Sequence, residues 1–245
     1  MVSQANRADT AWDTDPFAGW RGSLAALLAG ATLVLAFAPF SLWPAAILAP
    51  AILFALIHRR PPGRAFRLGW WFGLGQFGLG VSWVYQSFTL FGGIVAPLAV
   101  LVTALFVMAL AVYPALAAWL TARFARGGGR TAWALVFVGS WVLVEALRAW
   151  LFGGFPWLNL GISQVDGPLV GWLPIVGEYG LTAILLSLAL LVWHVARMGW
   201  WAPRASRRWL PAVIVLISVP LLSFPLRTIP WAQTSGETFS VGVAQ

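Results

Sequence analysis

The chain has 245 residues, of which 60% are hydrophobic and only 9% are charged. Soluble domains carry roughly 25% charged residues, so this composition excludes an ordinary water-soluble globular protein. The net charge is +8, but the arginines occur in short clusters between apolar runs, which favours a membrane protein over a nucleic-acid-binding one. The lack of cysteine excludes disulfides, thiolate metal sites and thiol nucleophiles in these residues.

Seven apolar runs predict transmembrane helices, because roughly 20 mostly apolar helical residues cross a bilayer core about 30 Å thick. The runs cover residues 22–38, 42–57, 68–85, 94–122, 131–151, 179–195 and 210–224. They predict an all-α polytopic membrane protein, with a tail at 1–21 and a transmembrane domain of about seven helices at 22–224. Prolines inside the second and fourth runs predict kinks at Pro44, Pro50, Pro97 and Pro114.

The arginines predict how these helices are oriented. Of the 15 arginines, all except Arg148 and Arg227 precede the first run or lie in the second, fourth and sixth connections. Because cytoplasmic connections are enriched in arginine, we expect the N-terminus in the cytoplasm and the C-terminus, after seven crossings, on the periplasmic face. Most of the 17 tryptophans lie near the ends of the runs, which is typical of an aromatic belt at the membrane interface.

Two pairs of residues within the runs have more than one interpretation. Gly69 and Gly73 in the third run have a spacing that lets a second helix approach closely; helix packing is favoured, and a groove for an acyl chain along the glycine face is the alternative. Glu145 and Arg148 in the fifth run are one turn apart and share a helix face. A structural ion pair, with Arg148 reaching toward the headgroups, is favoured; the alternative is an interior site that contacts a lipid phosphate or ester.

The connections on the arginine-poor side hold further candidate site residues. The third connection follows Trp83 and Tyr85, and the fifth, at about residues 152–178, contains Trp157, Gln164 and Asp166. The fifth connection is apolar enough to lie in the membrane interface, and a structureless loop of this length is uncommon unless it is functional. A re-entrant or interfacial helix that caps the bundle is the alternative.

The composition changes beyond the seventh run, at residues 225–245. A proline-containing linker at 225–236 is followed by Phe239, Val241 and Val243, which alternate with small or polar residues. This alternation predicts a strand with one buried face, and a single strand needs partners to be stable. We therefore interpret the sequence as the front part of a larger protein.

Five motifs in chain order resemble those of one family. They are Ala38-Pro39-Phe40 with Trp43-Pro44, Trp83-Val84-Tyr85 with Phe91-Gly92-Gly93, Glu145 with Arg148 and Trp150, Gly154-Phe155-Pro156-Trp157-Leu158, and Ser163-Gln164-Val165-Asp166-Gly167-Pro168-Leu169. Each motif alone is weak, but five in this order between the runs are specific. Over about residues 22–245, the chain resembles the membrane half of bacterial apolipoprotein N-acyltransferases.

The resemblance implies transfer of an acyl chain from a phospholipid to the amino group of the diacylglyceryl-cysteine that begins a lipoprotein. In the family, the acyl group passes through a thioester on a cysteine, with a glutamate base and a lysine that stabilises the oxyanion. These residues belong to a periplasmic nitrilase-like domain. Residues 239–245 of this chain resemble the first strand of that domain. The chain contains no cysteine and no lysine, so we assign no catalytic residue and expect the chain alone to be inactive.

The resemblance implies a membrane platform in the bacterial inner membrane. Membrane lipids surround it, and it holds the phospholipid donor and the lipoprotein acceptor, as a monomer, without a cofactor, metal ion or nucleic acid. The expected contact residues are Trp83, Tyr85, Glu145, Arg148, Trp157, Gln164 and Asp166. The alternative is a non-catalytic anchor for a glycosyltransferase that acts on lipid-linked sugars. A small transporter has little support, because charged pairs near mid-membrane and two related halves are missing from the sequence.

Overall fold

The computed structural model describes residues 19–198, 206–232 and 241–242; within them the chain is helical and has no strand. The longer helices are α2 (Trp20–Val34), α3 (Ala45–Ile57), α4 (Pro62–Gly80), α6 (Ala96–Phe124), α7 (Arg130–Trp150), α8 (Leu173–Met198) and α9 (Ser206–Leu226). The short elements are α5 (Val84–Gln86), η2 (Ser87–Phe91), η3 (Leu151–Gly153), η4 (Leu160–Gln164) and η5 (Val170–Trp172). The all-helical fold is confirmed for this part of the chain. The strand predicted at 239–245 lies outside the described residues except for Val241 and Gly242, so it stays a prediction.

The longer helices overlap the predicted apolar runs, but not all of them are long enough to cross a membrane. Four candidate spans combine sufficient length and hydropathy, at Ala96–Phe124, Arg130–Gly153, Val170–Arg197 and Trp209–Leu226. Helices α2 and α3 are apolar but have only 15 and 13 residues. At 1.5 Å per residue they are about 22 and 20 Å long, shorter than a bilayer core of about 30 Å. The structure is therefore that of a helical membrane protein, and the count of seven spans stays a prediction.

The prolines have two different roles in the helices. Pro44 is the N-cap of α3 and Pro97 lies in the first turn of α6, so the kinks predicted at these two positions are wrong. A proline is favourable at a helix start, because its missing N–H would have no helical partner there. Pro50 and Pro114 lie inside α3 and α6, as the sequence predicts.

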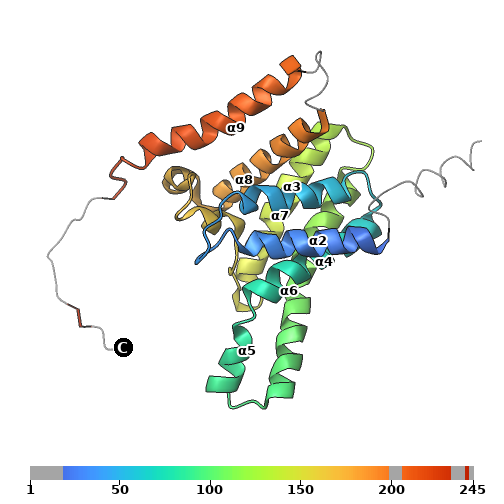
Figure 1. Cartoon of the computed structure of the whole chain (residues 1–245), viewed down its shortest axis with the longest axis vertical. Coiled ribbons are helices and arrows are strands. Elements are labelled where there is room, and N and C mark those ends of the chain that lie inside the picture. Colours follow the sequence, from blue (N-terminus) through green and yellow to red (C-terminus); the bar gives the residue numbers. More distant parts are fainter. Residues whose placement is uncertain (1–18, 199–205, 233–240, 243–245) are drawn as a thin grey trace, which may run out of the picture.

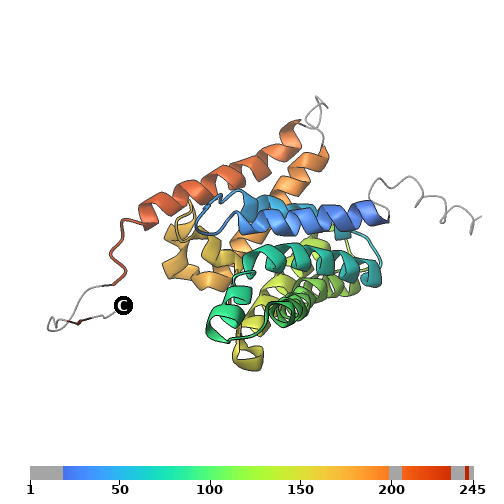
Figure 2. The ribbon, with the colours of Figure 1, turned by 60° about the horizontal axis from the view of Figure 1, so that its bottom comes forward.

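Helix α4 packs between α2 and α6, and glycines make both interfaces close. A Cβ at Gly73 would lie 2.6 Å from the Cα of Ala111, and one at Gly69 would lie 2.5 Å from the carbonyl oxygen of Pro114; both belong to α6. Gly75 faces the backbone of α2 in the same way. Figures 1 and 2 show α2 and α4 side by side. The glycine spacing therefore mediates helix packing, and an open acyl-chain groove along this face is wrong because α6 covers it.

The second half of the bundle is built on α3, α7 and α8. The Phe54 ring of α3 packs edge-on against Phe137 of α7 and Trp193 of α8, with ring centroids 5.0 and 4.8 Å apart. Helix α9 lies along the edge of this group and contacts α8 and η5 (Figure 1). Its Ser223 hydroxyl accepts a hydrogen bond from the backbone N–H of Gly171 at 2.9 Å.

The two ends of the bundle differ in charge. At one end, which we call the basic end, Arg59 and Arg126 from the second and fourth connections line one pocket. Arg197 of α8 lines a neighbouring pocket together with Arg59. Figure 1 shows these connections at its right-hand side. The opposite end, which we call the outer end, brings together parts of residues 34–41, 79–83 and 156–166. Within the described residues, the second and fourth connections and the end of α8 are thus grouped in space, as the arginine pattern predicts.

Candidate functional site

Residues 151–172, between α7 and α8, fold over the outer end of the bundle. They form three short 3-10 helices, η3 to η5, joined by turns. Asn159, Leu160, Gln164 and Leu169 of this segment are buried. The connection expected at 152–178 is shorter than that, because α8 begins at Leu173, with a break in its helical backbone at Gly177. Residues 151–172 form neither a structureless loop nor a single re-entrant helix. We call this segment the cap.

Arg148, near the end of α7, holds the first part of this cap in place. Its guanidinium donates hydrogen bonds to the carbonyl of Phe155 at 2.9 Å, to the carbonyl of Trp157, and to the side-chain oxygen of Asn159 at 2.6 Å. The Arg148 side chain is only 4% exposed and packs over the ring of Phe77. A buried guanidinium is costly unless its N–H groups find acceptors, so the cap carbonyls and the arginine stabilise each other.

Glu145, one turn earlier, holds the next part of the cap. One carboxylate oxygen accepts a hydrogen bond from the backbone N–H of Leu160 at 2.6 Å, and the other accepts one from the hydroxyl of Thr182 on α8 at 2.7 Å. The Thr182 oxygen in turn accepts a hydrogen bond from the backbone N–H of Gly161 at 2.9 Å. Glu145 therefore acts as a structural acceptor, since donors already occupy both of its oxygens.

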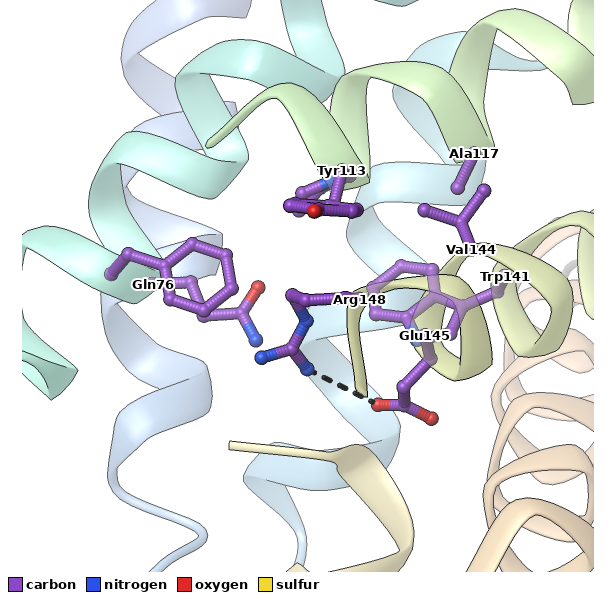
Figure 3. Close-up of a pocket in the computed structure, with 9 residues that line it drawn as sticks. Gln76, Tyr113, Ala117, Trp141, Val144, Glu145 and Arg148 are labelled. Atoms are coloured by element: carbon purple, nitrogen blue, oxygen red, sulfur yellow. Dashed lines mark ion pairs between the residues drawn. The ribbon is translucent and has the colours of Figure 1, made fainter. Parts of the chain in front are cut away.

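The ion pair between Glu145 and Arg148 faces the protein interior. The nearest nitrogen and oxygen are 4.0 Å apart, and the guanidinium does not extend toward the membrane surface. Figure 3 shows it beside a small cavity that Gln76 and Tyr113 also line. This cavity measures about 20 Å³, which is enough for one water molecule and far too small for a lipid phosphate or acyl chain. The geometry favours the structural interpretation of the pair, but with Arg148 turned inward.

A larger apolar groove lies on the surface of the outer end, and we call it the outer groove. Its volume is about 570 Å³, within the usual range of small-molecule sites. Its walls are the turn after α2 at residues 36–41, the end of α4, and cap residues 156–166. Trp83 and Trp157 pack together across it, with ring centroids 5.2 Å apart, and both are about half exposed. Asp166 supplies a carboxylate to its lining.

The candidate residues from the sequence fall into four groups. Trp83, Trp157 and Asp166 line the outer groove, whereas Glu145 and Arg148 lie beneath the cap. Gln164 is fully buried within the cap, where its side-chain nitrogen donates to the hydroxyl of Ser163 at 3.2 Å. Tyr85 is half-buried in α5 and does not line the outer groove.

Sequence reasoning missed three polar residues that complete the network beneath the cap. The Asn159 side chain accepts a hydrogen bond from Arg148 and donates one to the carboxylate of Glu178. The Thr182 hydroxyl links α8 to α7 through its hydrogen bond to Glu145. Asn159 is a polar residue in an otherwise apolar stretch, and that signal could have drawn attention to it. Thr182 gives no such signal, because a hydroxyl within an apolar helix usually bonds to its own backbone.

A second apolar groove lies on the other side of residues 154–158, between α6 and α7. It measures about 540 Å³, and its walls include Phe106, Tyr113 and Leu147 as well as the buried Arg148. Residues 154–155 line this α6–α7 groove, whereas residues 156–158 line the outer groove. The segment that Arg148 fixes is therefore the wall between two apolar grooves. Among the described residues, no cluster of three acidic, histidine or cysteine side chains could hold a metal ion.

A family model described as the apolipoprotein N-acyltransferase N-terminal domain matches residues 29–191. The chain belongs to the apolipoprotein N-acyltransferase family. The matched range runs from α2 into α8 and includes the cap and both grooves.

Curated apolipoprotein N-acyltransferases from several bacteria are similar to the chain along nearly all of its length. The one from Pseudomonas putida is 39% identical over 236 residues, which are 96% of this chain and 45% of the relative. Those from Azotobacter vinelandii and Coxiella burnetii are each 40% identical, over 239 and 224 residues, covering 96% and 91% of this chain and 44% and 45% of the relatives. The chain thus spans less than half the length of these apolipoprotein N-acyltransferases.

Proposed function

We propose that this chain is the membrane part of an enzyme that transfers an acyl chain from a phospholipid to the N-terminal diacylglyceryl-cysteine of a lipoprotein. The family assignment and the shared name of the curated relatives support this function over an anchor for a glycosyltransferase. The chain crosses the bacterial inner membrane several times as a monomer among membrane lipids. The arginine distribution supports a cytoplasmic basic end and a periplasmic outer end.

The observation that carries this proposal is the pair of apolar grooves at the outer end. Donor and acceptor are both lipids with acyl chains, and a platform for them needs two apolar sites close together. The outer groove and the α6–α7 groove, of about 570 and 540 Å³, share residues 154–158 as a wall. In this proposal one groove holds the donor chain and the other holds a chain of the acceptor.

The residues of this chain bind and orient the lipids rather than perform the covalent step. The chain has no cysteine and no lysine, and both oxygens of Glu145 are engaged by donors. Trp83 and Trp157 offer large apolar surfaces, and their indole N–H groups suit the headgroup level. Arg148 positions the wall between the grooves through the carbonyls of Phe155 and Trp157.

Photo-crosslinking tests the two grooves as lipid sites. Benzoylphenylalanine is placed at Trp83, Trp157 or Phe106 in the 245-residue chain, in membranes, and phospholipid adducts are quantified by mass spectrometry. The control position is Leu143, which is 62% exposed on α7 and lines neither groove. We expect several-fold more adduct at the three groove positions than at Leu143. Equal yields at all four positions would show that the grooves hold lipid no better than the outer surface of the bundle.

A second experiment tests whether these residues only bind and orient the lipids. The purified chain in phospholipid vesicles is mixed with a diacylglyceryl-cysteine peptide, and N-acylation of the peptide is followed by mass spectrometry. We expect no N-acyl product, because neither a cysteine thiolate nor a lysine is present to form and stabilise the acyl intermediate. Formation of product would refute the proposal that these residues only bind and orient the lipids.

A further inference from the structure

A basic pocket lies at the end of the bundle opposite the grooves. His58 and Arg59, which follow α3, line it together with Arg130 at the start of α7 and Trp193 and Arg197 near the end of α8. Its volume is about 330 Å³. The pocket thus forms where three helices meet, at the end of α3, the start of α7 and the end of α8.

The three guanidinium groups in this pocket have no acidic counterpart among the described residues. Within the described part of the chain, no carboxylate forms an ion pair with Arg59, Arg130 or Arg197, and the ion pair described above lies at the outer end. The field of the three arginines also reaches His58, whose pKa is lowered to about 4 by burial and by each of these guanidinium groups. Like charges that converge without a counter-charge favour an anion between them.

The backbone at Arg59 adds an independent observation. Arg59 follows the C-cap of α3 and has φ 59°, in the left-handed region. Glycine is the usual residue at this position after a helix, because any side chain raises the energy of this backbone conformation. An arginine at such a position indicates that its charged side chain has a role that glycine could not fill.

A second pocket adjoins the first and shares Arg59 with it. This pocket of about 440 Å³ is also lined by Arg60, Arg126, Gly128 and Trp133. His58 packs between the indoles of Trp133 and Trp193, with ring centroids 5.0 and 4.8 Å apart. Indole rings beside arginines are typical of the headgroup level of a membrane. Arg126 adds a fourth guanidinium group beside those of Arg59, Arg130 and Arg197, so the two pockets together offer more cationic surface than one phosphate group needs.

We propose that the pockets at Arg59 bind the phosphate groups of an anionic phospholipid from the leaflet at the basic end, with Arg59, Arg130 and Arg197 as its ligands. Guanidinium groups match phosphate oxygens in geometry as well as in charge. Two adjoining pockets with a common arginine fit a lipid that has two phosphates joined through glycerol better than one with a single phosphate. This site is separate from the acyl-chain grooves, so it does not depend on the proposed function of the outer end.

The test measures lipid binding to the purified 245-residue chain by native mass spectrometry. The ligands are cardiolipin, phosphatidylglycerol, zwitterionic phosphatidylethanolamine and free inorganic phosphate. We expect affinity in the order cardiolipin, phosphatidylglycerol, phosphatidylethanolamine, and no binding of inorganic phosphate at the same concentration. Equal binding of phosphatidylethanolamine would overturn a site that selects anionic lipids. Tight binding of inorganic phosphate would overturn a lipid as the source of the phosphate.

Matched variants separate this site from general surface charge. Arg59→Gly removes one guanidinium and relieves the positive φ, so the variant should melt no lower than the parent without added lipid. With Arg130→Gln added, cardiolipin affinity should fall about tenfold or more, since two charge-assisted contacts are lost. Arg123→Gln makes the same type of charge change at an exposed arginine of the basic end that lines neither pocket, and should keep parental affinity. Equal losses in Arg123→Gln and in the double variant would refute the site.

Discussion

Replacing Gly73 with alanine tests the packing of α4 against α6. The added Cβ would lie 2.6 Å from the Cα of Ala111, whereas carbon atoms pack best at about 3.5–4.0 Å. The two helices would have to move apart by about 1 Å, and a gap of that size forfeits roughly a quarter to a half of each dispersion contact along the interface. Overpacking of this kind lowers the free energy of unfolding by about 1–3 kcal/mol. This loss exceeds the stabilisation of about 0.5–1 kcal/mol that alanine provides over glycine inside a helix.

Gly139→Ala is the matched control, because a Cβ at Gly139 of α7 meets nothing within 4 Å. That variant should be neutral or stabilised by up to about 1 kcal/mol, so the two variants should differ by about 2 kcal/mol. Thermal unfolding in detergent, followed by tryptophan fluorescence, should show melting temperatures about 4–8 °C apart. Gly69→Ala opens the same interface, so adding it to Gly73→Ala should cost less than the sum of the single effects. Equal melting temperatures for Gly73→Ala and Gly139→Ala would show that the α4–α6 contact is not as close as described.

Two further predictions concern the polar groups at the ends of the bundle. Thr182→Val leaves an oxygen of Glu145 and the N–H of Gly161 without their partner, so unfolding titrations in detergent should show a loss of about 1–3 kcal/mol. Thr103→Val removes only a bond within α6 and should cost less than about 0.5 kcal/mol; similar losses in both variants would contradict the network. The pKa of His58 is lowered from 6.5 to about 4, first by burial and then by the neighbouring arginines. As the pH falls, His58 is therefore protonated in the unfolded chain before it is protonated in the folded chain. The stability that neutral His58 provides is complete above pH 6.5 and is lost as the pH falls toward 4. His58→Phe should flatten the dependence of the unfolding free energy on pH in this window, and an unchanged slope would assign the dependence to other groups.

The segment between α7 and α8 shows how far sequence reasoning reached at the candidate site. Its length and its turn residues indicated a functional connection, and Glu145 and Arg148 stood out as charges within an apolar run. Their partners are mostly backbone groups of the cap, such as the carbonyls of Phe155 and Trp157. Every residue has a carbonyl, so the sequence contains no sign of which ones a buried arginine will find.

The sequence by itself determined the apolar runs, the helical class, and the separation of a basic from an arginine-poor side, because these follow from hydropathy and charge along the chain. Only the tertiary structure decided that Pro44 and Pro97 begin helices and that α6 covers the glycine face of α4. It also decided that the arginine of the fifth run turns inward to carry the wall between two grooves. The contact of α4 with α6 depends on which distant segments meet. The acceptors of Arg148 are nearby in the chain but are backbone carbonyls, which every residue has, so the pattern of side chains does not identify them.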